Sequence, residues 1–519
     1  MKKNIQDIFT YHEQTKHAPR RYARSLGYMD WANQPDPFRS YRGAEKITLP
    51  LAHNHNTPPY HLIFTSQVPT APLLLESLSQ FLQFCMGISA IKSNGIDEWA
   101  LRCNASSGNL HPSEAYLLLP PIQGVSEQTS ITHYAPKDHS LELLSTFESS
   151  LFETLPEGSF FVLISSIVYR EVWKYGERAF RYTQLDAGHA MRAAQVSGLT
   201  LGWDSSLIDS LSDTELNKLF GLDQESRFHP NERESADMLL LFSPQRSYAD
   251  VDLSSLAPAP FESIANTLAT NHQKWPLISL IEEASKGTLA KREKAEPFIA
   301  QREPSRDVKS VILKRRSAQM MDRSHAWISK KSFLTLLHAT QESFSGYQNS
   351  VNLVLFVHSV EELDSGLYLY LRQEDHLEDL KSSLDPSFLF EKREPKLFLL
   401  KKGDYRAISQ NISCNQSIAS DGAFSLGMLA SFSQEIINYG EHRYKELYWE
   451  CGAIGQQLYL ESTSQGLSAT GIGCFLDDIF HELLGLESNK YQSLYHFTIG
   501  RALSDPRILT KEPYAQRES

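Results

Sequence analysis

An internal repeat is the feature that most constrains this chain. When the chain is aligned with itself at an offset of 264 residues, residues 175–222 fall on residues 439–486 without a gap. Ten of these 48 positions are identical, where ordinary residue frequencies predict about three. The identities gather at a Tyr-Gly-Glu motif, at several glycines and at a Leu-x-Gly-Leu ending. We infer that the chain contains a duplicated domain.

The two copies span most of the chain. Residues 134–142 resemble residues 370–378 once small gaps are allowed, which extends the repeat toward the start of each copy. A length of 519 residues is also too great for one ordinary core. We expect an N-terminal domain over 1–250, a linker with some helix over 251–305, where a proline-containing stretch and a charged run lie, and a C-terminal domain over 306–519.

Helical and strand patterns alternate along both copies. Residues 186–201 and 450–465 have apolar positions at helical spacing, and Gly202 and Gly466 follow them, as a glycine often follows a helix. Apolar runs that suit buried strands lie at Ala115–Leu119, Phe160–Val168, Met238–Phe242, Val351–Val357 and Leu494–Ile499. The alternation indicates α/β or α+β domains.

Charge and composition exclude several classes of protein. The balance of 50 Lys+Arg against 62 Asp+Glu gives a net charge of −12, which argues against a nucleic acid or an anionic membrane as partner. No apolar run reaches the roughly 18 residues of a membrane span, so we expect a cytoplasmic protein. The five cysteines are scattered, and the His481-Glu482 pair lacks the second histidine of a zinc-protease motif. We therefore expect no metal.

Two polar clusters have the chemistry of a ligand site. The N-terminal copy contains Ser106, Ser107 and Asn109 around a glycine, so small donors can approach a planar, acceptor-rich ligand; an ordinary polar turn has the same composition. The C-terminal copy contains Arg315, Arg316 and Ser317, which can clamp a phosphate. Two such arginines are also common on a solvated surface.

Two further clusters can have either a functional or a purely structural role. Gly471, Ile472 and Gly473 allow the backbone to pass close to a ligand, although turns also use glycine. Lys174 and Tyr175 lie together in Trp-Lys-Tyr-Gly-Glu-Arg, where a lysine beside a tyrosine can deliver a proton or stabilise an anion. The arginines and the aspartate that follow can equally form a structural ion network.

These residues resemble the FMN-dependent nitroreductases and the related azoline oxidases, which dehydrogenate cyclised Ser, Thr and Cys in modified peptides. SSGNLHPSEAY, KRRS, GLSATGIG and Ile499-Gly500-Arg501 resemble flavin-binding segments of the superfamily, and WKYGERAFRY resembles the KYG motif of the azoline oxidases. The resemblance covers about residues 20–245 and 308–508. It implies an α+β fold (α/β type): two nitroreductase-like domains, each a mainly antiparallel sheet flanked by helices, forming an intramolecular pseudo-dimer.

The resemblance also implies how a flavin site divides between the copies, because each site of the family's dimers draws on both subunits. Arg315, Arg316, Ser317 and Arg501 match the phosphate-binding part. Ser106, Ser107 and Asn109 match the part that bonds the ribityl chain or the pyrimidine edge. Gly471, Ile472 and Gly473 match the loop that faces the hydride-carrying ring edge, and Lys174 and Tyr175 match the proton-transfer pair.

Neither copy contains all of these segments. The C-terminal copy has no SSGN match near residues 347–352, and the N-terminal copy has Leu207 and Asp209 where the other has Gly471 and Gly473. Because the two deficits are complementary, we expect one complete site and a single FMN per chain.

Three activities follow from the resemblance. The chain is a reductase fed by NADH or NADPH, an oxygen-dependent azoline-type dehydrogenase, or a non-catalytic scaffold of a peptide-modifying complex. The expected partner is a small molecule or a modified peptide. The expected assembly is a monomeric pseudo-dimer or a homo-oligomer.

Overall fold

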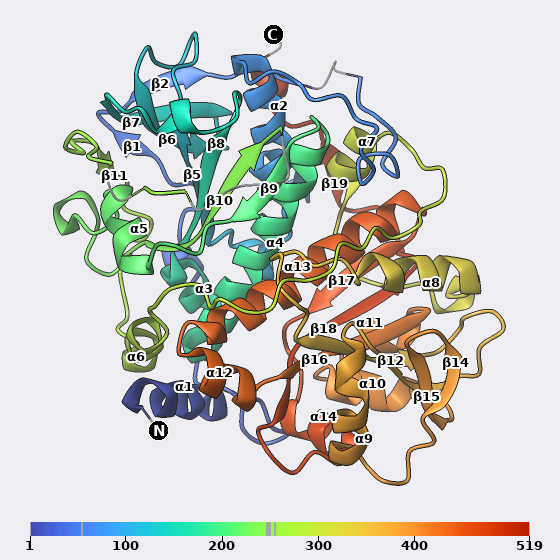
Figure 1. Ribbon diagram of the computed structural model, residues 1–519. Helices are drawn as coiled ribbons and strands as arrows, with labels where there is room; N and C mark the ends of the chain where they lie inside the picture. The colour runs from blue at the N-terminus through green and yellow to red at the C-terminus, as the bar shows by residue number, and fades with distance from the viewer. Residues whose placement is uncertain (1, 53–55, 245–250, 254–255, 518–519) are drawn as a thin grey trace. The chain divides into compact units, whose positions relative to one another are not determined.

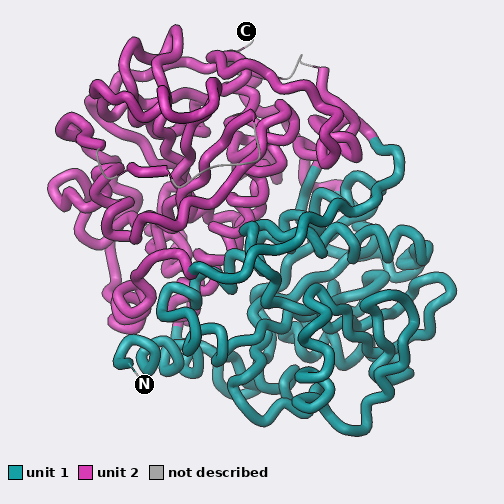
Figure 2. The backbone as a smooth tube through the Cα atoms, in the orientation of Figure 1, with its two compact units in different colours: residues 1–24, 291–305, 315–505 teal, residues 25–290, 306–314, 506–519 magenta. Residues whose placement is uncertain are grey.

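The computed structural model describes the whole chain except residues 1, 53–55, 245–250, 254–255 and 518–519. It divides into two compact units (Figure 2). Unit 1 comprises residues 1–24, 291–305 and 315–505, and unit 2 comprises residues 25–290, 306–314 and 506–519. The units interleave in sequence, because each contains one terminal segment of the chain that lies far from its main part in sequence.

Unit 2 is built on an antiparallel sheet of seven strands in the order β2-β7-β6-β5-β8-β10-β9. In chain order these are β2 (Glu45–Thr48), β5 (Ser113–Leu119), β6 (Thr129–Ala135), β7 (Ser140–Phe147), β8 (Phe160–Ser166), β9 (Asp204–Leu207) and β10 (Ser235–Ser243). The helices of this unit include α2 (Leu75–Met86), α3 (Val168–Tyr175), α4 (Ala179–Leu199), α5 (Asp213–Leu219) and α6 (Pro276–Ala284). The long helix α4 packs on β5, β8 and β9 (Figure 1).

Unit 1 repeats this plan. Its seven-stranded sheet has the order β14-β15-β13-β12-β16-β18-β17. The strands are β12 (Val351–Val357), β13 (Gly366–Tyr370), β14 (Glu391–Glu394), β15 (Leu397–Lys402), β16 (Phe424–Ser431), β17 (Ser468–Ile472) and β18 (Tyr491–Gly500). Its helices include α1 (Lys3–Gln14), α8 (Lys330–Ala339), α9 (Leu377–Ser383), α10 (Arg406–Ile412), α11 (Ile418–Asp421), α12 (Ser433–Tyr439), α13 (Arg443–Ser464) and α14 (Asp477–Leu484).

The repeat in sequence is a repeat in structure. An offset of 264 residues places α3 on α12, α4 on α13, β9 on β17 and α5 on α14, each within one residue. The shared glycines mark the turns between these elements: Gly202 and Gly466 have φ of 69° and 71°, and Gly221 and Gly485 have φ of 67° and 73°. Because L side chains rarely adopt this left-handed backbone, both copies need glycine there.

Each unit has its own apolar core under its sheet. In unit 2 alternate strand residues such as Leu163 and Leu239 pack with Leu216 of α5 and with Phe261. In unit 1 the corresponding core contains residues of the central strands and Phe480 of α14. The strands β5, β8 and β12 are buried at every residue, so both faces of each sheet are covered.

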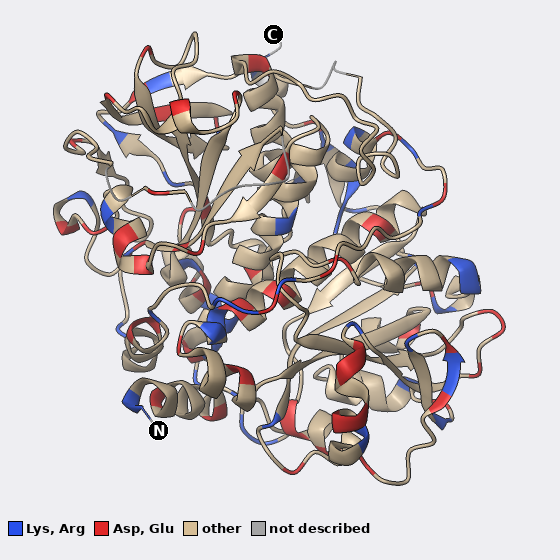
Figure 3. Cartoon of the chain, in the orientation of Figure 1, with Lys and Arg blue, Asp and Glu red and all other residues tan. Residues whose placement is uncertain are grey.

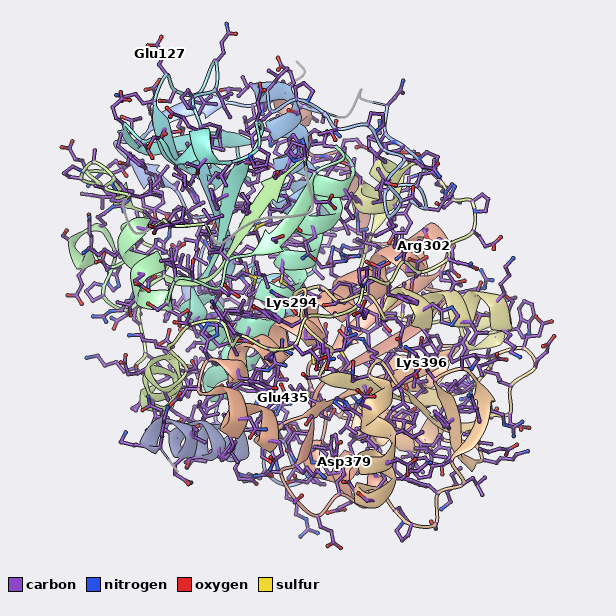
Figure 4. All side chains as sticks on the ribbon, viewed as in Figure 1. Glu127, Lys294, Arg302, Asp379, Lys396 and Glu435 are labelled. Atoms are coloured by element: carbon purple, nitrogen blue, oxygen red, sulfur yellow. The ribbon has the colours of Figure 1, made fainter. Side chains whose placement is uncertain are left out.

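The segment before the second copy is fixed to unit 1 by ion pairs. Arg302 (labelled in Figure 4) donates to Glu461 at 3.0 Å and to Glu342 at 2.8 Å, and its side chain is almost fully buried. The N-terminal helix α1 joins the same unit, where His12 Nε2 lies 3.2 Å from Gln492 Oε1. Both segments therefore belong to the fold of unit 1.

The C-terminal segment belongs to unit 2. Strand β19 (Leu509–Lys511) pairs with β3 (Ile88–Ser93), which also pairs with β4 (Glu98–Arg102). The hydroxyl of Tyr514 accepts a hydrogen bond from the Ile88 N–H at 2.9 Å and donates one to the Pro136 carbonyl at 2.8 Å. The end of the chain thus completes a small sheet beside the first copy.

The structure confirms the expected fold class. Both sheets are antiparallel and flanked by helices, and each apolar run expected as a strand lies in one, although the run ending at Val168 passes from β8 into α3. The expected linker contains one helix, α6. The compact units follow contacts in space and do not test the boundaries at residues 250 and 305, which stay a prediction.

Acidic and basic residues are interspersed along both units (Figure 3). None of the described helices is both long enough and apolar enough to cross a membrane.

The pairing of β19 predicts that the chain end protects the first copy. Deleting residues 506–519 should speed amide exchange over Ile88–Ser93, because β3 loses the strand that covers one edge. The milder Tyr514→Phe change removes two hydrogen bonds and should cost about 1–2 kcal/mol. Exchange followed by mass spectrometry measures both effects, and Glu512→Ala at an exposed position is the control. Unchanged protection of β3 in the deletion variant would contradict this assignment.

Candidate functional site

The loop that contains Ser106, Ser107 and Asn109 has an unusual backbone. Between β4 and β5, Gly108, Asn109 and His111 have φ of 58°, 61° and 51°. A left-handed residue other than glycine costs roughly 1–2 kcal/mol, so the surrounding structure must hold this loop in place. The loop is therefore a specific construction and not an ordinary polar turn.

Hydrogen bonds within unit 2 hold the loop. The Ser107 N–H and hydroxyl both donate to the carboxylate of Asp186 on α4, at 3.0 Å. The Ser106 hydroxyl oxygen accepts from the His111 N–H at 2.8 Å, and the Asn109 amide donates to the Ala100 carbonyl at 3.0 Å. Ser106, Ser107 and Asn109 thus have partners within the protein, and Asp186 is the anchor of the loop.

The loop brings two separate motifs together. A Cβ built on Gly108 would lie 2.7 Å from the Tyr175 hydroxyl and 3.1 Å from Lys174 Nζ. Both side chains are half-buried, and the Lys174 ammonium lies 5.3 Å from the centre of the Tyr175 ring. A side chain at residue 108 would displace the Tyr175 hydroxyl and the Lys174 side chain from these positions. The structure thus places the expected proton-transfer pair directly against the SSGN loop.

A buried polar layer lies beneath the pair. Arg170 donates to the His111 carbonyl at 2.7 Å and to Glu114 at 2.5 Å, which fixes the far end of the loop. Burial raises the pKa of Glu171 well above its usual range, and the Asp186 carboxylate adds to this shift. Neither carboxyl oxygen of Glu171 has a hydrogen-bond partner among the described residues. Burial therefore favours the neutral form of Glu171, on the helix that carries Lys174.

The second copy shows why Glu171 is exceptional. Its counterpart at the offset of 264 is Glu435 (labelled in Figure 4), which accepts from Arg443 Nε at 2.7 Å and from the Ser350 hydroxyl at 3.1 Å. The residue that corresponds to Arg443 in the first copy is Ala179. The first copy has kept the glutamate and lost the arginine that would neutralise it.

In unit 1 the arginine motif and the glycine motif lie side by side. Ser317 forms a parallel bridge with Ala469 of β17, and the Ala318 N–H donates to the Ala469 carbonyl at 3.0 Å. Further along the same segment, the Asp322 N–H donates to the Arg501 carbonyl at 2.7 Å, just after β18. The backbone thus brings the segments of Arg315, Arg316, Ser317 and Arg501 to one edge of this sheet, where Arg315 is buried and Arg501 is exposed.

Tyr459 of α13 connects these segments. Its hydroxyl lies 2.8 Å from the Ser317 hydroxyl and accepts from the Gly471 N–H at 2.8 Å. The Arg315 guanidinium lies 5.1 Å from the centre of its ring, within range of a cation–π interaction. Sequence reasoning missed Tyr459, because a tyrosine inside a helix pattern has no signal that separates it from core.

The glycine motif has a packing function as well. A Cβ on Gly471 would lie 1.7 Å from the Tyr495 hydroxyl, so no side chain fits there whatever the protein binds. Ile472 is buried in a small apolar cluster with Ala318 and Met321. Gly473 follows directly after β17 and is half-buried. Tyr495, also missed from sequence, explains one of the glycines on which the expected site rests.

Comparisons with known proteins agree with this geometry. A model of the nitroreductase family matches the chain twice, over residues 88–229 and 312–501, which together exceed half of its length. A protein of Methanocaldococcus jannaschii named as a nitroreductase is 25% identical over 158 residues, which cover 29% of this chain and 75% of that protein. The double match supports the tandem arrangement inferred from the repeat.

Solved structures show the same fold. A crystal structure from Anabaena variabilis, described as a nitroreductase, covers 97% of this chain and 100% of its own, with a TM-score of 0.70 at 21% identity. A chain of the Escherichia coli microcin synthetase complex covers 47% of this chain at 18% identity, with a TM-score of 0.28. A similarity at that score carries no information about activity.

The contact at Gly108 predicts a large cost for a single methyl group. Gly108→Ala combines left-handed strain with a collision against Tyr175 and Lys174. Gly95→Ala is the matched control, since Gly95 has φ of 88° and nothing within 4 Å of its Cβ position. We expect about 1–2 kcal/mol from the control and a clearly larger loss from Gly108→Ala, partly relieved by Tyr175→Phe. Denaturation curves test this, and equal losses at the two glycines would show that the pair does not lie against the loop.

The buried state of Glu171 predicts a pH dependence. Its folded pKa is raised above the ordinary value of 4.5, so its contribution to stability is full below pH 4.5 and is lost as the pH rises through the folded pKa. Glu171→Gln keeps the shape of the neutral acid without titrating. The melting temperature of the unmodified protein should therefore fall relative to Glu171→Gln as the pH increases from 5 to 9. Exposed Glu157→Gln should show no such trend, and parallel curves for Glu171→Gln would mean that Glu171 is already charged.

Proposed function

Because the chain belongs to the nitroreductase family, we propose that it is an FMN-dependent oxidoreductase through which hydride equivalents pass. The observation that carries the proposal is the placement of Lys174 and Tyr175 against the left-handed loop at Gly108. A strained loop that presents a cation and a phenol at one point is typical of a functional site.

The residues present fit this cofactor. An FMN phosphate needs cationic donors, and the segments of Arg315, Arg316 and Arg501 converge at one edge of their sheet. A flavin ring also needs polar groups beside it, and Lys174 and Tyr175 provide such groups next to the loop at Gly108. Asn104 adds a buried amide oxygen without a partner among the described residues.

The division of the site between the copies is a proposal from sequence. Arg315, Arg316, Ser317 and Arg501 would bind the phosphate, and Ser106, Ser107 and Asn109 would shape the loop at the ribityl chain or pyrimidine edge. The Gly471–Gly473 backbone would face the ring. The complementary losses in the two copies support one FMN per chain.

The protein's own groups would position the reactants and manage protons. FMN, when bound, supplies the redox chemistry. Tyr175 can hold a proton at its hydroxyl and Lys174 at its ammonium, close enough to the loop to serve a substrate there. Asp186 keeps the loop in its left-handed form through Ser107, so it acts as a positioning residue.

The electron source and the substrate follow from the family resemblance. We propose NADH or NADPH as donor, with a small molecule as acceptor, in a cytoplasmic enzyme. The second candidate is an oxygen-dependent dehydrogenase of azolines in a modified peptide, which the resemblance of the segment around Lys174 and Tyr175 to the KYG motif of azoline oxidases supports. Steady-state oxidation of NAD(P)H with a nitro or quinone acceptor separates the two.

Cofactor content tests the proposal directly. The protein as isolated should be yellow and release about one FMN per chain on denaturation. Arg315→Ala or Arg316→Ala should weaken binding by roughly 2–5 kcal/mol, about 30-fold or more, because phosphate charge loses its partner. Asn109→Ala should also weaken it, whereas Leu207→Ala and Asp209→Ala, at the glycine positions of the lost site, should not.

Two results would contradict this proposal. A colourless protein that takes up no added FMN would support a non-catalytic scaffold. A content near two FMN per chain, or loss of flavin in Asp209→Ala with full retention in Asn109→Ala, would reject the division of residues between the copies.

A further inference from the structure

A second cluster of functional side chains lies in unit 2 and has no part in the proposed redox site. His229, Glu232 and His272 each offer one ligand atom, and these atoms all lie within 4.8 Å of one another. His229 and Glu232 belong to the turn before β10, which the Glu232 N–H closes by donating to the His229 carbonyl at 2.9 Å. His272 comes from the segment before α6. The sequence predicts no metal, because the cysteines are scattered and the His481-Glu482 pair lacks a second histidine, and neither observation concerns these three residues.

The carboxylate of Glu232 is buried and fixed by three partners. Its two oxygens accept from the backbone N–H groups of Leu268 at 2.7 Å and Ala269 at 2.8 Å. His272 Nε2 lies 2.7 Å from the same carboxylate. A buried carboxylate needs such compensation, by hydrogen bonds, by a cationic group or by a metal ion.

The imidazoles of His229 and His272 lie against each other. Their rings stack with centroids 4.1 Å apart and an interplanar angle of 17°. The Asn231 N–H donates a hydrogen bond to His229 Nδ1 at 3.3 Å.

The cluster lies beside a cavity. This cavity of about 630 Å³ is lined in part by Pro230, Asn231, Gln273 and Lys274, and His229, Glu232 and His272 are not among its lining residues. Pro230 and Gln273 directly follow the two histidines in sequence.

From these observations we propose that His229, Glu232 and His272 form a site for a divalent first-row transition metal ion that clips the turn before β10 to the segment before α6. Two imidazoles and one carboxylate suit Zn²⁺ and its neighbours better than Mg²⁺ or Ca²⁺, which prefer oxygen ligands. His272 exchanges its hydrogen bond to Glu232 for the metal. The two backbone donors continue to orient the carboxylate, as outer partners of metal ligands do.

Zinc titration of the full chain tests this site. After treatment with EDTA and dialysis, calorimetric titration with ZnCl₂ should show one strong site per chain. His229→Ala and His272→Gln should each weaken that site by about tenfold or more. His325→Ala is the control, because His325 is exposed and pairs with Asp322 in the other unit.

The variants are chosen so that folding does not decide the result. His229 is only half-buried, and His272→Gln keeps a donor for Glu232. Without zinc, both should melt near the unmodified protein, whereas zinc should raise the melting temperature of the unmodified protein and of His325→Ala only. No strong site in the unmodified protein, or equal zinc affinity in all four proteins, would overturn the proposal.

Discussion

The candidate site of the first copy depends on one interaction, the capture of Ser107 by Asp186. Gly108, Asn109 and His111 have left-handed backbones, and this part of the chain would relax if nothing opposed the strain. The carboxylate of Asp186 on α4 accepts hydrogen bonds from the N–H and from the hydroxyl of Ser107. Arg170 holds the other end of the loop at the His111 carbonyl. The approach of Lys174 and Tyr175 to Gly108 follows from these two anchors.

The second copy has kept the anchor but not the loop. Glu450 corresponds to Asp186 and accepts from the backbone N–H groups of Ser350 and Val351 at 3.2 Å and 3.1 Å, at the start of β12. Arg372 also pairs with Glu450. The fold therefore uses an acid at this place in both copies to bind the segment before the central strand. Both copies contain this contact between the acid and the backbone, although the residues around it differ.

Sequence patterns predicted what is local and repeated. The helices α4 and α13, the buried strands and the left-handed glycines at 202 and 466 were accessible because periodicity and the repeat report on backbone geometry. The partners of the site were not. Tyr495 requires glycine at 471, and Tyr459 connects Gly471 to Ser317, through contacts whose register no periodicity encodes. For the same reason sequence did not show which unit receives residues 1–24 and 506–519.

Comparing the two copies distinguishes features that the fold requires from features that a function requires. Both long helices contain buried charged residues: Asp186 and Arg181 in α4, and Arg443 and Glu446 in α13. Because both copies share this feature, it belongs to the fold and is weak evidence of a catalytic function. What differs is more informative. At the offset of 264 residues Lys174 corresponds to Asn438. Arg443 pairs with Glu435 in the second copy, and because Ala179 stands in its place in the first copy, Glu171 has no such partner. An unpaired buried acid lowers stability. The first copy therefore differs from the second at Lys174 and in the pairing of Glu171, whereas Tyr175 and the acid that anchors the loop have counterparts in both copies.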